Sequence, residues 1–283
     1  MTWAVARFTF REAVRKKVLL GALVLSVGFL VVYALGAQLS YNDFAIHNPT
    51  MRGPAGVGSL KPVIASALSL AGLYVVNFLA GALAIFTAVG TIASEIDSGT
   101  LHAILPKPIH RRDVVLGKWL GYAIMLVIYL ALMATGVLLI IYVTWGQAQP
   151  QPLLGMALMS LSTLLLLSLT ILGGTVFGVL ANGIVVFMLY GVGLMGGFVE
   201  QIGKLLSNDT MVNVGIVTSL IIPSDVLWKM ASYVMQSQAL LAQAVTTPFF
   251  GSSAPSSAMI VYAIVYTAVA VVLAVLIFNR RDL

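Results

Sequence analysis

The sequence has very few charged residues and no cysteine. Only 8% of the 283 residues are Asp, Glu, Lys or Arg, whereas about a quarter of a typical soluble domain is charged. This small number of charged residues cannot cover a surface exposed to water. The composition therefore excludes an ordinary soluble protein. The absence of cysteine excludes disulfide frameworks, thiolate metal sites and a cysteine nucleophile.

Common motifs of catalysis and nucleotide binding are also missing. The sequence contains no G-x-x-x-x-G-K-[ST] loop, no H-E-x-x-H pair and no G-x-S-x-G turn. The histidines His47, His102 and His110 are scattered, and the topology deduced below places His47 across the membrane from the other two. We therefore expect this chain to have no catalytic site of its own and to bind no metal or cofactor.

Long apolar runs dominate the chain, since 60% of its residues are hydrophobic and its mean hydropathy is +1.04. A helix needs about 20 apolar residues to cross roughly 30 Å of hydrocarbon. This criterion predicts an all-α, polytopic membrane protein whose residues 1–283 form a single transmembrane domain. The six predicted spans are Val18–Ala37, Val63–Ala93, Val114–Tyr142, Leu153–Leu180, Gly183–Val199 and Ser257–Phe278. The first run is longer than the apolar region of a cleaved signal peptide, so we interpret it as a retained helix.

Basic residues determine the predicted orientation, because Lys and Arg collect in cytoplasmic loops. With the N-terminus inside, eleven of the 15 Lys and Arg residues are cytoplasmic. The four outside are Arg52, Lys61, Lys204 and Lys229. Both termini are then cytoplasmic, acidic residues lie at the edges of the spans, and the net charge of +6 reflects topology rather than binding to nucleic acid.

Residues 1–17 form a basic, amphipathic segment before the first span. One helical face would carry Trp3, Ala6, Phe10, Ala13 and Val14. The stripe beside it, spaced i, i+4, i+8, consists of Arg7, Arg11 and Arg15. This pattern predicts a helix in the membrane interface whose arginines reach lipid phosphates. The alternative is a disordered basic tail that only sets topology, but such tails contain few aromatic residues.

The extracytoplasmic segment 200–256 is the largest part outside the predicted spans. Its apolar stretch Met211–Ile222 is too short to cross a bilayer and is predicted to be re-entrant or interfacial. Ser224 is predicted to cap a long following helix on the outer membrane surface. The alternative is a seventh span, which would bury Asp209 or Asp225 and place the C-terminus outside.

Three Gly-x-x-x-Gly pairs lie within or beside the predicted spans. They are Gly117–Gly121, Gly174–Gly178 and Gly193–Gly197. Small residues at this spacing let two helices approach closely. The pairs therefore indicate a helical bundle without identifying which helices touch.

Residues 94–113 form a polar, proline-broken island between the second and third spans. An aspartate or a serine can cap a short helix there, and two prolines prevent its continuation. The apolar stripe of that helix consists of Leu101, Ile104 and Leu105. A second helix begins near His110 and runs into the third span. A plain solvated loop needs neither a stripe nor prolines, so the island is predicted to be a docking surface for another protein.

The island resembles the cytoplasmic motif of ABC type-2 permeases, the membrane subunits of many ATP-binding-cassette exporters. The motif reads approximately E-x-x-x-G-T-L-x-x-L-L-x-K-P-I-S-R-x-x-x-x-x-G-K. The matching residues are Glu95, Gly99, Thr100, Leu101, Ile104, Leu105, Lys107, Pro108, Ile109, Arg111, Gly117 and Lys118. His110 stands where the family usually has serine. The six spans and the basic N-terminal helix extend the resemblance over the whole chain.

The resemblance implies a permease subunit, not itself an enzyme, that couples ATP hydrolysis by a separate ATPase to export. The short helix near Ser98–Leu105 would be the coupling helix, seated in a groove of the ATPase, and residues 1–17 would be the interface helix beside it. The implied ATPase-coupling residues are Glu95, Gly99, Thr100, Leu101, Ile104, Leu105, Lys107, Pro108, Arg111 and Lys118.

The resemblance also implies an assembly. Two such permeases, identical or different, and two ATPases would make one transporter in a bacterial or archaeal plasma membrane. ATP and Mg²⁺ would bind to the ATPases and not to this chain. The apolar spans favour a lipid-like or amphipathic substrate. Two alternatives stay open: a permease-like component for metalloenzyme maturation or ion export, and a non-transporting scaffold or sensor docked to an ABC ATPase.

Overall fold

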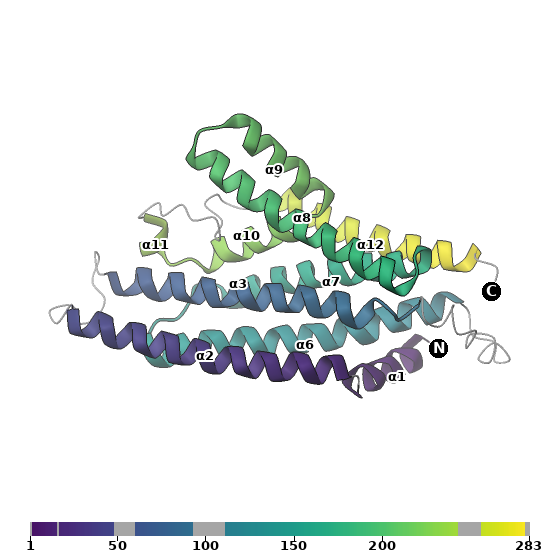
Figure 1. The fold of residues 1–283 in the computed structure, drawn as a ribbon, viewed down its shortest axis with the longest axis horizontal. Coiled ribbons are helices and arrows are strands. Elements are labelled where there is room, and N and C mark those ends of the chain that lie inside the picture. Colours follow the sequence, from purple (N-terminus) through teal and green to yellow (C-terminus); the bar gives the residue numbers. More distant parts are fainter. Residues whose placement is uncertain (1, 16, 48–59, 93–110, 243–255, 281–283) are drawn as a thin grey trace.

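The computed structural model describes residues 2–15, 17–47, 60–92, 111–242 and 256–280, and every regular element in these ranges is an α-helix (Figure 1). The helices are α1 (Thr2–Arg15), α2 (Lys17–His47), α3 (Leu60–Ala88), α6 (Arg111–Trp145), α7 (Pro152–Val176), α8 (Val179–Leu205), α9 (Asp209–Ile221), α10 (Ser224–Met235), α11 (Gln238–Ala242) and α12 (Ser257–Arg280). The predicted all-α fold is confirmed.

Six of the described helices are long and apolar enough to cross a membrane, as the sequence predicts. They are α2, α3, α6, α7, α8 and α12. An α-helix can span a bilayer because its backbone hydrogen bonds are completed within the segment. Two spans extend well beyond their predicted C-terminal ends: α2 continues beyond Ala37 to His47, and α8 continues beyond Val199 to Leu205.

The extension of α2 packs against the end of α6. The ring centroids of Tyr41 and Phe44 lie 5.5 and 5.6 Å from that of Trp145, which is fully buried. The indole Nε1 of Trp145 also donates a hydrogen bond to the carbonyl of Ala37, 3.3 Å away. Aromatic pairs at these separations add stability beyond the area they bury. Tertiary packing therefore lengthens α2 beyond the apolar run that defined the predicted span.

The core of the bundle lies between α3, α6 and α7. Their inward faces contribute most of its buried apolar residues, among them Leu70 and Leu73 of α3, Leu126 of α6 and Leu166 of α7. In contrast, α2 and α12 bury few of their side chains. Lipid solvates an exposed apolar face as well as a neighbouring helix does, so these exposed faces are typical of helices that border the bilayer.

Both described ends of the chain lie at the same end of the bundle. Thr2 at the start of α1 and Arg280 at the end of α12 are on the right in Figure 1. We call this the terminal end, and the opposite end, where α2 stops and α3 starts, the distal end. An even number of crossings brings the two termini to the same side, so this arrangement agrees with six spans.

A sharply bent pair of helices, α9 and α10, precedes the last span. The two axes differ by 104°, so they do not form one straight seventh span. Figure 1 shows α9 returning beside α8 and α10 leading on to α11. The apolar stretch predicted to be too short to cross the bilayer is therefore a 13-residue helix in a re-entrant or broken arrangement.

The long helix expected after Ser224 is divided, and the predicted cap was wrong. Pro223 occupies the N-cap position and Ser224 is already helical, with no capping hydrogen bond from its side chain. The helix then ends at Met235. The reason is tertiary, because the amide of Ser237 donates to the hydroxyl of Ser66 at the start of α3, 3.1 Å away. That bond fixes the chain in a turn between α10 and α11.

Candidate functional site

The residues predicted to couple to an ATPase lie mostly outside the described residues. These are Glu95, Gly99, Thr100, Leu101, Ile104, Leu105, Lys107 and Pro108, together with the short helix expected around them. Arg111 begins α6, but its side chain also lies outside the described set. Of the predicted coupling side chains, the structure places Lys118. It also places the two pieces of chain that flank the island, at Ile92 and at the start of α6.

Lys118 ties those two flanking pieces together. Its side chain is 6% exposed, and its Nζ donates a 2.7 Å hydrogen bond to the carbonyl of Thr91. The hydroxyl of Thr91 donates to the hydroxyl of Tyr122, 3.0 Å away on the next turn of α6. Charge-assisted hydrogen bonds of this kind are stronger than neutral ones. The chain therefore enters and leaves the island through a fixed junction between α3 and α6.

Helix α1 packs against α6 beside this junction. A Cβ added to Gly117 would lie 2.6 Å from the Cβ of Val5, and one added to Gly121 would lie 2.7 Å from the carbonyl of Ala6. The hydroxyl of Thr2 donates to the carboxylate of Asp113 over 2.9 Å. The first Gly-x-x-x-Gly pair is thus the surface on which α1 lies, because glycine lets the two backbones approach.

The faces of α1 differ in part from the predicted ones. Its buried residues are Ala6, Thr9 and Ala13, small enough for the close approach to α6. Trp3, predicted to share that face, is 70% exposed, and Phe8 is 71% exposed. Arg7 and Arg11 are exposed, Phe10 is partly buried, and the side chain of Arg15 lies outside the described residues. Small residues rather than aromatic ones determine which side of α1 faces the bundle.

A buried ionic cluster joins α8 to α10 in the outer part of the predicted topology. The Nζ of Lys229 lies 2.8 Å from Asp225 Oδ2 and 2.8 Å from Glu200 Oε2, and that of Lys204 lies 2.6 Å from Glu200 Oε1. The side chains of Lys229 and Glu200 are each 13% exposed. Two lysines and two carboxylates balance formally, as buried charges must if they are to be tolerated.

The acidic residues of the cluster lie near the ends of their helices. Glu200 is five residues before the end of α8, near the edge of that span, and Asp225 is buried although α9 and α10 do not form one straight span. The i, i+4 spacing of Glu200 with Lys204, and of Asp225 with Lys229, was readable in the sequence. The contact between the two pairs was not, because it depends on α10 folding back onto α8.

Glycine makes that fold-back possible. A Cβ at Gly197 would collide with the carboxylate of Asp225, and one at Gly193 would lie 3.4 Å from Ile222, the residue after α9. The third Gly-x-x-x-Gly pair is therefore the surface that receives the junction of α9 and α10. Within the described residues, no three His, Asp or Glu side chains group to hold a metal. The cluster thus fastens α10 to α8.

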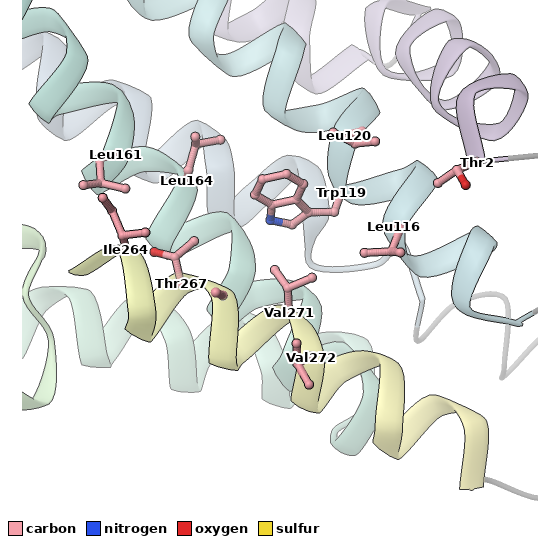
Figure 2. Close-up of a pocket in the computed structure, with 11 residues that line it drawn as sticks. Thr2, Leu116, Trp119, Leu120, Leu161, Leu164, Ile264, Thr267, Val271 and Val272 are labelled. Carbon is pink, nitrogen blue, oxygen red and sulfur yellow. The ribbon is translucent and has the colours of Figure 1, made fainter. Parts of the chain in front are cut away.

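An apolar cavity of about 510 Å³ opens between α6, α7 and α12 towards the terminal end (Figure 2). Trp119 and Leu120 of α6 face Leu164 of α7 and Val271 of α12 across it, and Thr2 of α1 stands at its rim. The volume is within the range of small-molecule sites, about 300–1,000 Å³. Sequence reasoning did not find this cavity, since three helices from distant parts of the chain form it.

Comparison with known proteins agrees with the resemblance of the island. The family model described as "ABC-2 family transporter protein" matches residues 3–283, which is nearly the whole chain. No curated protein gives a match. The family match covers α1, all six spans and the α9–α10 pair, so it concerns the arrangement described above and not the island alone.

Proposed function

Since the chain belongs to the ABC-2 family of transporter proteins, we propose that it is the permease subunit through which a separate ATPase drives export. The chain is a multi-pass membrane component of an ABC transporter and not itself a catalytic enzyme. In this proposal it supplies the membrane path, and ATP and Mg²⁺ are bound by the ATPase partner. Coupling requires a mechanical connection between that partner and the spans.

The junction around Lys118 is the observation that supports coupling. It joins the end of α3, through the Thr91 carbonyl, to the first turns of α6. Both helices belong to the core, and α1 braces the same turns of α6 at Gly117. A displacement of the island between residues 93 and 110 is therefore transmitted to α3 and α6 together. The predicted stripe of Leu101, Ile104 and Leu105 is the proposed contact with the ATPase.

We further propose an assembly of two permeases and two ATPases in a bacterial or archaeal plasma membrane, with both termini in the cytoplasm. The exposed apolar faces of α2 and α12 leave room for a second permease, identical or different. The positive-inside distribution of Lys and Arg supports a cytoplasmic location of the terminal end. The same end carries the two flanks of the island, which is where a cytoplasmic ATPase would dock.

The proposed substrate class is lipid-like or amphipathic. The charged cluster found within the described part of the bundle is internally balanced, and it lies between α8 and α10. Most of the remaining span surface that the structure describes is apolar, and small hydroxyl groups such as those of Thr87 and Thr163 are bonded to their own helices. The buried polar side chains in these spans include Asn77, Asn182 and Lys118. A mostly apolar surface suits an apolar substrate better than a free ion, whose charge must stay solvated or paired.

The proposal is tested by co-purification and ATP turnover. We expect the tagged chain, solubilised in mild detergent, to retain an ABC ATPase, and Leu101→Asp to abolish both retention and permease-dependent ATP turnover. A carboxylate in the stripe would have to be desolvated in the ATPase groove, which costs several kcal/mol, on the order of the whole contact. His102→Ala, a change outside the stripe, is the matched control and should behave as wild type.

Two outcomes would contradict the proposal. One is that no ATPase co-purifies under any mild solubilisation that keeps the chain folded. The other is that Leu101→Asp leaves the ATP turnover of the reconstituted complex unchanged. Tryptophan fluorescence during thermal unfolding of each variant separates loss of coupling from loss of folding.

A further inference from the structure

The apolar cavity beside α12 has no polar group free to bind a ligand. The indole Nε1 of Trp119 donates to the hydroxyl of Ser168 over 2.8 Å. The hydroxyl of Thr267 donates to the carbonyl of Ala263, and that of Thr2 to Asp113. Every polar side chain that lines the cavity is thus already bonded within the protein. An occupant can gain only from apolar burial, so its buried part must be hydrocarbon.

The dimensions of the cavity suit one acyl chain. Along α12 the lining runs from Ile264 to Val272, a rise of about 12 Å at 1.5 Å per residue. One leaflet contributes about half of a hydrocarbon core roughly 30 Å thick, or about 15 Å. The cavity is therefore nearly as long as the share of the hydrocarbon core that one leaflet contributes. Figure 2 shows Trp119 and Val271 on opposite walls of this slot.

An exposed arginine continues one wall of the cavity towards the terminal end. Arg112 precedes Leu116 by four residues on α6, so the two residues share a helix face. Arg112 is exposed. The nearest carboxylate on α6, that of Asp113, is engaged by Thr2. One guanidinium group therefore lies about one helical turn beyond the apolar slot.

We propose that this cavity is a binding site for an anionic membrane phospholipid, with one acyl chain between α6, α7 and α12 and its phosphate beside Arg112. An apolar slot with a cationic side chain one helical turn beyond it matches an amphiphile of that shape and charge. Basic pockets between transmembrane helices are known to hold anionic headgroups in this way. Binding at this site needs no ATPase.

The test uses the purified full chain without any partner. The chain, in mild detergent, is mixed with equal amounts of phosphatidylglycerol and phosphatidylcholine, and retained lipid is measured by native mass spectrometry. We expect one phosphatidylglycerol to be retained in preference to phosphatidylcholine. Ala268→Phe fills the cavity and should weaken retention about tenfold, as overpacking of 1–3 kcal/mol implies. Val269→Phe, on the neighbouring lipid-exposed position of α12, is the matched control and should bind as wild type.

A separate variant tests the proposed contact with the lipid headgroup. Arg112→Gln changes an exposed residue, so the fold should be kept, and it should reduce the preference for phosphatidylglycerol about fivefold, as the loss of roughly 1 kcal/mol implies. Equal retention of the two lipids by wild type would overturn the anionic site. Wild-type retention by Ala268→Phe would overturn its location. Neither result depends on whether the chain couples to an ATPase, so failure here leaves the proposed function standing.

Discussion

Lys229 of α10 and Glu200 of α8 are separated by 29 residues, and their side chains meet at 2.8 Å. The same Nζ lies 2.8 Å from Asp225, one turn earlier on α10. A single buried lysine therefore bridges two carboxylates and fastens the α9–α10 pair to the last turns of α8. This relationship also explains why α8 continues past Glu200, since the carboxylate is paired and not left alone in an apolar environment.

Replacing Lys229 should destabilise the chain far more than replacing Lys204. Lys229→Met leaves Glu200 and Asp225 partly or fully buried without their shared partner, and breaking a buried pair in this way costs about 3–5 kcal/mol. Lys204 is 37% exposed, and exposed pairs contribute about 0–1 kcal/mol. Thermal unfolding followed by tryptophan fluorescence measures both. Equal midpoints for Lys229→Met and Lys204→Met would show that the cluster does not hold α10.

A disulfide should form between α8 and the end of α9. A Cβ added to Gly193 would lie 3.6 Å from the Cβ of Ile222, within the usual disulfide range of about 3.5–4.5 Å. The chain has no native cysteine, so Gly193→Cys with Ile222→Cys has no background. We expect oxidation to block maleimide labelling of this pair. Gly191→Cys with Ile222→Cys is the control, because no atom lies within 4 Å of a Cβ at Gly191. Full labelling of the first pair after oxidation would contradict the arrangement.

A bulky residue at Gly117 should displace α1 from α6. The added side chain of Gly117→Leu would begin 2.6 Å from Val5 Cβ and 2.8 Å from the Thr2 carbonyl. Overpacking of 1–3 kcal/mol predicts that amide hydrogen exchange in α1 accelerates about tenfold. Gly28→Leu on α2 meets no atom within 4 Å and should leave exchange in α1 unchanged. The packing described for α1 is refuted if the two variants exchange alike.

Removing the amine of Lys118 should separate ATPase binding from coupling. Lys118→Met takes away the donor to the buried Thr91 carbonyl, and an unsatisfied buried carbonyl costs about 1–3 kcal/mol. The predicted ATPase contact at Leu101 is untouched, so co-purification should persist while permease-dependent ATP turnover falls. Lys61→Met at the distal end is the control. Normal turnover in Lys118→Met would show that the junction does not carry the coupling.

The spans were predictable because the information that specifies them is local. Each is a run of apolar residues long enough to cross hydrocarbon, and an α-helix satisfies its backbone without help from the rest of the chain. The same reasoning identified the stretch before Ile222 as too short to cross. Reasoning from local sequence was less accurate at the ends of the helices. Tertiary contacts prolong α2 at Tyr41 and Phe44 and stop α10 before Ser237.

The contacts within the site are a different matter, because they join residues that lie far apart in the sequence. The glycine spacing showed that helices approach closely, and only the fold shows that Gly117 receives α1 and that Gly193 receives the end of α9. The cavity at Trp119 required α6, α7 and α12 to be placed together. The predicted coupling residues from Glu95 to Pro108 lie outside the described residues and stay predictions.

The amino-acid sequence by itself determined that this protein lies in a membrane and that it has six apolar spans. It also determined the family that the polar island resembles. Hydropathy and short motifs act along the chain, and each can be read one segment at a time. Tertiary structure alone decided which charges are paired, which glycines are interfaces and where a cavity opens. A salt bridge such as Lys229 with Glu200 depends on the relative position of two helices, and no property of either segment alone contains that position.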